Sequence, residues 1–289
     1  MRRKGQGEHT DVVKQQAVPF HVIAGGGLLL TAALMYWINA APSAVLNPPA
    51  QAVPLSTRNG YWLPPEKQEL GSFVKVLLAS NGEVWGRIFA EHGQSYRNPQ
   101  LVLYSGQVAS PCGMSREAGS PFYCPGDQKL YLDLDYLARM EQQWRSSVSF
   151  KKAGDFALAY VVAHEFGHHI QTLLAVGEWM EVQRHQMNAR SFRRLQVRFE
   201  LQADYLAGIW AHYAGKWSPE LLGIGDIEDA VRMVNVVGDD RIQKHLEGRG
   251  RPETFMCGTS EQRARWFYKG YKSGNLGGAN TFLVPDSEL

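Results

Sequence analysis

The sequence has almost no charge imbalance. Its 30 Lys and Arg residues face 28 Asp and Glu residues, which leaves a formal net charge of +2 over 289 residues. The basic residues are scattered along the chain and do not form the patch or stripe that a nucleic-acid-binding surface requires. The composition therefore excludes an electrostatically driven nucleic-acid binder, and we predict that nucleic acid is not a partner. With 44% hydrophobic residues, the chain can still bury a sizeable core.

Long uncharged runs are scarce, and the one that stands out lies near the start. Residues 22–41, "VIAGGGLLLTAALMYWINAA", carry no charge and are long enough to cross a bilayer as a helix. Basic residues precede this run, whereas no Lys or Arg follows it before Arg58. The positive-inside rule then places residues 1–21 in the cytoplasm and everything after the run on the other side. We predict one transmembrane helix over residues 22–41.

Two alternatives to a membrane anchor remain open. A cleaved signal peptide would use "INAA" or "APSA" as its small-residue cleavage site, although the apolar run is longer than usual for such peptides. A buried helix of a soluble domain is the other alternative, but three consecutive glycines would weaken a helix in water and are tolerated in lipid. Both the anchor and the signal peptide export the rest of the chain.

Cysteine is the third scarce feature, with three residues in the chain. Cys112 and Cys124 flank a loop rich in Gly, Pro and Ser, "CGMSREAGSPFYC". Outside the cytoplasm such a pair favours a disulfide, with two free thiols as the alternative. Cys257 would be left unpaired.

The rest of the chain reads as a linker followed by one domain. Residues 42–66 contain six prolines and little periodicity, which predicts an extended linker, and the globular domain would occupy residues 67–289. The fold class predicted is α+β, mainly helical with a small β-sheet. The expected helices are a helical segment over 68–93 with a break at 80–82, a helix capped by Asp155 that runs to about 176, and helices over 191–213, 226–237 and 260–272, the last with a capping box of Thr259 and Gln262. The β-prone segments are "LVLYSG" and "KLYLDL", with the cysteine loop between them.

The densest chemistry lies in "AYVVAHEFGHHIQTLL", residues 159–174. Residues four apart share one face of a helix, so His164 and His168 of this HExxH sequence can direct two imidazole nitrogens at one metal ion. Glu165 lies beside that face, where it can take a proton from a zinc-bound water as the catalytic base. A histidine-rich surface helix is the alternative, but the apolar residues around the motif would bury most of the helix.

A hydrolytic zinc site needs a third protein ligand and an open position. No further Gly and His follow the motif closely, which excludes a third histidine ligand of that kind. The segment "RFELQADYLAGIW" instead offers Glu200 and Asp204, again four apart and embedded among apolar residues. We predict that Glu200 completes the Zn²⁺ site and that Asp204 accepts the free N–H of a ligating histidine.

Five segments, in order, resemble one family: "PFYCPGDQKLYLDL", "GDFALAYVVAHEFGHHIQ", "ELQADYLAGIW", "VVGDDRIQ" and "GTSEQRARWF". The chain resembles the bacterial putative neutral zinc metallopeptidases, membrane-anchored members of the HExxH zincin group, over roughly residues 67–282. The resemblance implies a zincin-like core in which the Glu200 helix packs against the active-site helix. It also implies a cleft-lining edge strand such as "KLYLDL", which would pair with an extended peptide substrate.

Three positions depart from the family pattern. The family usually has Cys at Tyr205 and in the segment around Asn280, so this chain would lack one disulfide and keep the Cys112–Cys124 bridge. The family pattern also has His at the position of Cys257. If that histidine helps to hold the oxyanion of the tetrahedral intermediate, this chain lacks one donor to it. Cys257 would otherwise be a redox-sensitive thiol, an extra metal ligand or a buried inert cysteine, and the last is favoured.

Other polar residues are weaker candidates. His169 adjoins His168 and points elsewhere, so a surface or packing position is favoured. Transition-state donors could come from Tyr205, Arg263 or His245, between which the sequence does not decide. Asp239 and Asp240 are expected to cap or bridge helices.

These observations predict a single-pass metallopeptidase of the bacterial inner membrane, with its N-terminus cytoplasmic and its catalytic domain periplasmic or extracellular. It would act as a zinc endopeptidase on peptides or proteins, and membrane or envelope proteins are the expected partners. Two alternatives stay open: a catalytically weakened zinc-binding scaffold or regulatory domain, and a hydrolase of cell-wall peptides.

Overall fold

The computed structural model describes residues 65–115, 119–147, 153–218, 221, 238–240, 251 and 254–289. The predicted cytoplasmic tail, transmembrane helix and nearly all of the linker lie outside these residues, as does the helix expected over 226–237. Within the described residues, no helix contains an apolar stretch long enough to cross a membrane.

Helices dominate the described part of the chain. The long ones are α2 (Pro65–Glu91), α3 (Leu134–Ser147), α4 (Ala153–Leu173), α5 (Val176–Gln186), α6 (Ala189–Trp217) and α9 (Ser260–Ser273). Two short 3₁₀ turns, η2 (Leu276–Gly278) and η3 (Asp286–Glu288), follow α9.

The strands form two small sheets. They are β1 (Gln100–Tyr104), β2 (Val108–Ser110), β3 (Gly113–Ser115), β4 (Phe122–Cys124) and β5 (Lys129–Asp133). The larger sheet has the order β1-β5-β4, with β1 parallel and β4 antiparallel to β5, and β2 and β3 form an antiparallel pair. The predicted class, α+β with a small sheet, is confirmed, and the sheet is mixed.

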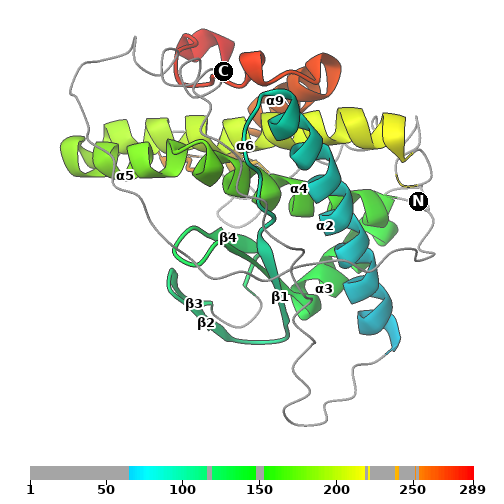
Figure 1. The fold of residues 1–289 in the computed structure, drawn as a ribbon. Coiled ribbons are helices and arrows are strands. Elements are labelled where there is room, and N and C mark those ends of the chain that lie inside the picture. Colours follow the sequence, from blue (N-terminus) through cyan, green and yellow to red (C-terminus); the bar gives the residue numbers. More distant parts are fainter. Residues whose placement is uncertain are drawn as a thin grey trace.

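The strands lie together on one side of α4 and α6 (Figure 1). Helix α6 runs through the middle of the molecule and packs against α4 and α9, and β4 is a strand that contacts α4. Figure 1 shows the strands below this helical layer and the C-terminal segment above it. The core lies between the helices, where α6 contributes its almost continuously buried half, Leu201–Ala211. The HExxH helix is therefore covered by a helix on one side and by a strand on another.

Most predicted element positions are confirmed, and several are corrected. Helix α2 has no break at residues 80–82. Asn81 Nδ2 donates to the Leu77 carbonyl at 2.9 Å, and Ser80 Oγ accepts from Trp210 Nε1 at 3.1 Å. Asp155 lies inside the first turn of α4 and does not precede the helix. Helices α3 and α5 were not predicted; α5 is separated from α4 by a turn at Ala175, whose φ is 58°.

The start of α9 follows the sequence prediction closely. Thr259 accepts from the Gln262 N–H at 3.1 Å, and Gln262 Oε1 accepts from the Thr259 N–H at 2.9 Å, so the capping box is confirmed. This cap matters for the site, because α9 carries Arg263 one residue later.

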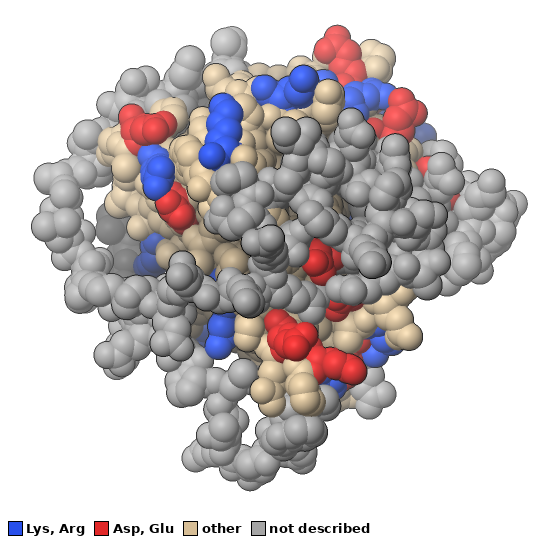
Figure 2. Space-filling model, turned by 90° about the vertical axis from the view of Figure 1, so that its right-hand side faces the viewer, with Lys and Arg blue, Asp and Glu red and all other residues tan. Residues whose placement is uncertain are grey.

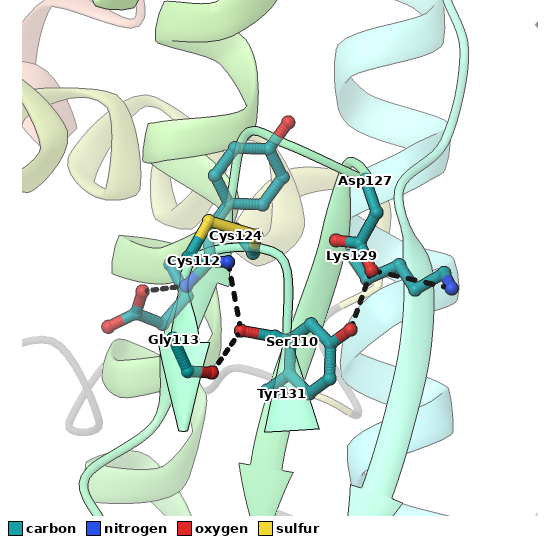
Figure 3. The surroundings of a disulfide bond; sticks show 9 residues. Ser110, Cys112, Gly113, Cys124, Asp127, Lys129 and Tyr131 are labelled. Atoms are coloured by element: carbon teal, nitrogen blue, oxygen red, sulfur yellow. Dashed lines mark hydrogen bonds and ion pairs between the residues drawn. A yellow bond between two sulfur atoms is a disulfide. The ribbon is translucent and has the colours of Figure 1, made fainter. Parts of the chain in front are cut away.

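The predicted disulfide is also confirmed. Cys112 and Cys124 are bonded, with their Cα atoms 5.7 Å apart. The bond ties β4 to the loop that connects β2 and β3, where Ser110 Oγ accepts from the Cys112 N–H and donates to the Gly113 carbonyl (Figure 3). The disulfide therefore restrains β4 at its C-terminal residue.

Surface charge does not gather by sign on the face of the molecule that Figure 2 shows. Figure 2 shows both basic and acidic side chains among the described residues of that face, and the basic ones do not form a single patch.

Candidate metal centre

The site is built where α4 and α6 pack closely against each other. A Cβ atom added to Gly167 of α4 would lie 2.8 Å from the Ala203 carbonyl oxygen of α6, so a side chain at position 167 would push the helices apart. Gly167 stands between the two histidines of the HExxH motif. The close approach lets α6 bring Glu200 to the face that carries them.

Three side chains converge at this point, as predicted. One donor atom from each of His164, His168 and Glu200 lies within 4.8 Å of the others. Glu200 Oε2 is 3.2 Å from His164 Nε2 and 3.5 Å from His168 Nε2. Tetrahedral zinc with bonds of 2.0–2.1 Å separates its ligand atoms by about 3.3 Å. The donor set and both carboxylate distances therefore fit a zinc ion.

Asp204 holds His164, also as predicted. Its Oδ1 lies 2.8 Å from His164 Nδ1, and because an ionised carboxylate can only accept, the imidazole must donate from Nδ1. His164 Nε2 is then the ring atom that faces Glu200, 3.2 Å from Oε2. The same carboxylate accepts from the Tyr160 hydroxyl and from Arg263, whose Nε is 2.9 Å from Oδ2.

The second histidine has a different partner. His168 Nδ1 lies 2.8 Å from Gln171 Oε1, one turn further along α4, and its ring stacks on Phe199 with centroids 5.2 Å apart. One histidine of the cluster is thus held by a carboxylate and the other by a neutral amide.

The electrostatics of the cluster favour positive charge. Burial disfavours the charged form of His164, but Asp204 and Glu200 outweigh burial and raise the pKa of His164 to about 10. Burial likewise works against the Glu200 carboxylate, yet the two imidazoles hold its pKa well below the usual range. A divalent cation would meet the same negative potential while leaving both imidazoles neutral.

Glu165 lies beside the cluster on the strand side. Its Oε2 accepts from the Tyr123 backbone N–H at 2.9 Å, so the carboxylate faces β4. Burial raises the pKa of Glu165 above its usual value, which suits a group that must take up and release a proton.

This contact corrects the expectation for "KLYLDL". That segment forms β5, which lies between β1 and β4 and so is not an edge strand. Strand β4 is the edge strand next to α4, and the Tyr123 N–H points from that edge toward Glu165. The family resemblance had pointed to the five-residue β5, whereas the strand at the edge is β4, which spans only three residues.

The other polar residues considered from the sequence, His169, Tyr205 and His245, lie in different places. His169 is fully buried and not on the surface, with Nε2 2.6 Å from the Arg97 carbonyl and Nδ1 3.2 Å from the Tyr123 hydroxyl. The Tyr205 hydroxyl lies 2.7 Å from Ser273 Oγ and donates to the Asn275 carbonyl, which places it against the segment after α9. His245 lies outside the described residues.

Cys257 is near the cluster without belonging to it. Its burial, with the Glu200 carboxylate adding to the effect, raises the pKa of its thiol to about 12, so the thiol stays protonated. Asp239 Oδ2 accepts from the backbone N–H groups of residues 256–258, and Asp240 accepts from Ser260 at the start of α9. Asp240 therefore caps the start of α9, as predicted, whereas Asp239 binds the backbone of the segment before it.

Sequence reasoning missed several residues of the site. Arg263 was considered as a transition-state donor, but it pairs with Asp204 and Tyr160 instead. Tyr160 and Gln171 lie one turn before and after the ligands on α4, and this spacing could have identified them. Tyr136 of α3 is also near the site, because burial, together with the nearby Glu165 carboxylate, raises the pKa of its hydroxyl. No sequence spacing relates Tyr136 to the HExxH motif.

Comparisons with known proteins agree with this site. The family model described as "Putative neutral zinc metallopeptidase" matches residues 4–282. The chain is 39% identical over 229 residues to Uncharacterized protein YpfJ of Escherichia coli (strain K12), which covers 78% of this chain and 75% of that protein. It is 38% identical over 222 residues to Uncharacterized protein Rv2575 of Mycobacterium tuberculosis, covering 74% and 72%. No solved structure matches.

Proposed function

The chain belongs to the putative neutral zinc metallopeptidase family, and from this membership and the site geometry we propose that it is a zinc-dependent peptidase with a zincin-like catalytic core. The observation that carries the proposal is the convergence of His164, His168 and Glu200 from two helices, with Glu165 beside them. A structural zinc site would use four protein ligands and would have no need of a half-buried carboxylate at Glu165.

The proposed reaction is hydrolysis of a peptide bond. Zinc would supply Lewis acidity, polarising the scissile carbonyl and acidifying the attacking water. Glu165 takes the proton from that water and passes it to the leaving amine. The Tyr123 N–H holds the Glu165 carboxylate in position, and Asp204 holds His164 in the tautomer that leaves Nε2 free.

The proposed substrate is an internal stretch of a peptide or protein. Strand β4 presents its outer edge toward the catalytic base, and an extended peptide can add to such an edge through backbone hydrogen bonds. Lateral docking of this kind needs no chain terminus, which favours an endopeptidase.

The proposal includes the place of the reaction. Residues 22–41 would anchor the chain in the bacterial inner membrane, with residues 1–21 in the cytoplasm and the catalytic domain in the periplasm or outside the cell. The Cys112–Cys124 disulfide supports an oxidising compartment. Its substrates and partners would then include membrane or envelope proteins.

The test compares two variants of the full chain, purified in detergent. Glu200→Ala is expected to lose most of its zinc, measured by elemental analysis after dialysis, because two imidazoles remain as ligands. Glu165→Gln is expected to keep its zinc and to lose cleavage of an unfolded protein by about a hundredfold or more, since a general base contributes 10²–10⁴.

Two results would point to other functions. A wild-type chain that binds zinc but cleaves no substrate, and whose zinc binding Glu165→Gln does not change, would indicate a zinc-binding scaffold. The observation that suggests this alternative is Cys257 at the position where the family has histidine. Cleavage of peptidoglycan fragments in preference to unfolded protein, abolished by Glu165→Gln, would indicate a cell-wall peptide hydrolase.

A further inference from the structure

A chain of side-chain amides connects the metal-ligand cluster to the segment after α9. His168 Nδ1 lies 2.8 Å from Gln171 Oε1, and Gln171 Nε2 donates to Gln202 Oε1 at 3.0 Å. Gln202 Nε2 in turn donates to the Ala279 carbonyl at 2.9 Å. The connection therefore runs from α4 through α6 to the residue that follows η2.

The direction of every bond in this chain is determined by its two carbonyl ends. The Ala279 carbonyl can only accept, so Gln202 must turn its NH₂ group toward residue 279 and its oxygen toward Gln171. Gln171 then donates to that oxygen and also to the Phe199 carbonyl at 2.7 Å, so its own oxygen faces His168. Because Gln171 Oε1 can only accept, the hydrogen bond between it and His168 requires an N–H on Nδ1 of His168.

This direction has a consequence for metal binding. A neutral imidazole that donates from Nδ1 keeps its lone pair on Nε2, and Nε2 is the atom 3.5 Å from Glu200. His164 reaches the same state through the carboxylate of Asp204. His168 reaches it through a backbone carbonyl three hydrogen bonds away.

The two amides that connect His168 to the Ala279 carbonyl, Gln171 and Gln202, are called the relay below, and both are buried. Gln171 and Gln202 are 0% and 4% exposed, so an amide turned the wrong way would leave donors and acceptors unpaired without water to replace them. The segment after η2 is held independently by Thr281, whose Oγ1 donates to the Arg198 carbonyl at 2.6 Å. It can thus keep the Ala279 carbonyl in place for Gln202.

We propose that Gln171 and Gln202 are positioning residues that preset His168 as a metal ligand and couple it to the segment Leu276–Phe282. Docking of this segment favours the zinc-binding tautomer of His168, and zinc binding favours docking, since such coupling is reciprocal. The inference rests on the proposed zinc site, but its test measures metal affinity and backbone protection and does not depend on peptidase activity.

The first experiment measures zinc affinity by competition with a chromophoric chelator, on the full chain in detergent. Gln171→Met is expected to weaken zinc binding about 10–100-fold, as loss of an outer partner of a ligand does. Gln202→Met, which leaves Gln171 in contact with His168, is expected to weaken it about fivefold or more. The matched control is Gln186→Met at the exposed end of α5, which should bind zinc as the wild type does.

A third variant separates positioning from packing. In Gln171→Glu a carboxylate still accepts the His168 N–H, so most of the affinity lost in Gln171→Met should return. The new carboxylate cannot donate to Gln202 Oε1. The Gln202 amide would therefore turn its NH₂ group toward the carboxylate at position 171, and its hydrogen bond to the Ala279 carbonyl would be lost. This variant should therefore bind zinc while the segment Leu276–Phe282 no longer responds to it.

The second experiment follows that response by hydrogen exchange. Zinc should slow exchange in residues 276–284 of the wild type and of Gln186→Met, and should change it little in Gln202→Met and Gln171→Glu. Equal zinc affinity in all variants, or equal protection by zinc in all of them, would overturn the relay. A wild-type chain that binds no zinc would instead overturn the proposed function on which the relay rests.

Discussion

At the scale of single residues, the protein resolves the burial of three neighbouring histidines in different ways. His164 and His168 face carboxylates that favour positive charge, whereas His169, one residue further, faces neutral partners. The Arg97 carbonyl can only accept, so Nε2 of His169 carries the proton and Nδ1 accepts from the Tyr123 hydroxyl. Because His169 contacts the side chain of Tyr123 and Glu165 contacts its backbone, this histidine also supports the position of β4.

His169 should make stability depend on pH. Burial lowers its pKa to about 4 from the ordinary value of 6.5, so between these values the unfolded chain binds more protons than the folded one. The free energy of unfolding should therefore fall as the pH drops from 6.5 toward 4, by about 1.4 kcal/mol per pH unit from this group. His169→Gln should remove that contribution from the slope.

Urea unfolding of the chelator-treated chain at several pH values measures this effect, because removal of zinc excludes a contribution from metal release. His185→Gln, on the exposed face of α5, is the control and should keep the wild-type slope. Identical slopes for wild type and His169→Gln would show that His169 is not the group responsible.

At the scale of elements, the site depends on how closely helices approach one another. Gly167 lets α4 reach α6, and Gly208 and Gly270 do the same between α6 and α9, since a Cβ at either would collide with backbone atoms of the other helix. The first approach brings the histidines to Glu200, and the second brings Arg263 to Asp204. The glycines thus set the distances on which the ligand geometry rests.

Gly167→Ala should therefore both destabilise the protein and weaken zinc binding. Its new methyl group meets the Ala203 backbone, which cannot turn aside as a side chain can, and overpacking of this kind costs about 1–3 kcal/mol. Gly215→Ala in α6 is a matched control, because nothing lies within 4 Å of its Cβ. This control should raise stability by about 0.5–1 kcal/mol and leave zinc affinity unchanged.

Chemical denaturation and chelator competition on the two variants provide both readouts. If Gly167→Ala binds zinc as tightly as Gly215→Ala, the close approach of α4 and α6 is not what sets the ligand distances.

The disulfide acts at the same scale, by restraining β4. Replacing both Cys112 and Cys124 by Ser should lower the free energy of unfolding by about 3 kcal/mol, as expected for a closed loop of this length. Hydrogen exchange at Tyr123 should also become faster, because β4 loses one of its attachments beside Glu165. Denaturation midpoints and exchange rates equal to those of the wild type would contradict this role.

At the scale of the whole molecule, the proposed function combines an export segment with a zinc site. The two lie far apart in the sequence, and the linker over residues 42–66 would hold the domain away from the bilayer. Residues 22–41 would provide the attachment to the membrane.

Cell fractionation tests this arrangement. The full chain should remain in the membrane fraction after alkaline extraction, and protease added to spheroplasts should digest the catalytic domain. A chain that lacks residues 1–41 should be soluble and untouched by the external protease. Recovery of a soluble, exported chain whose N-terminus begins after residue 41 would instead identify the run as a cleaved signal peptide.

Local regularities in the sequence were enough to predict the helices that carry the His164, His168 and Glu200 cluster, the capping box and the disulfide. A helix repeats every 3.6 residues, so His164 with His168 and Glu200 with Asp204 must each share a face. A capping box or a short disulfide loop likewise involves residues close in sequence, whose chemistry is visible in the letters.

Tertiary structure alone decided the rest. It placed β4 beside Glu165, buried His169, joined α2 to Trp210 of α6 through Ser80 and turned Arg263 toward Asp204. Each of these outcomes depends on a partner from a distant element, whose direction no local period records. The sequence by itself determined which atoms can bind a metal, and the packing of α4, α6 and α9 decided how those atoms are held, because hydrogen-bond partners in a core are chosen by distance in space.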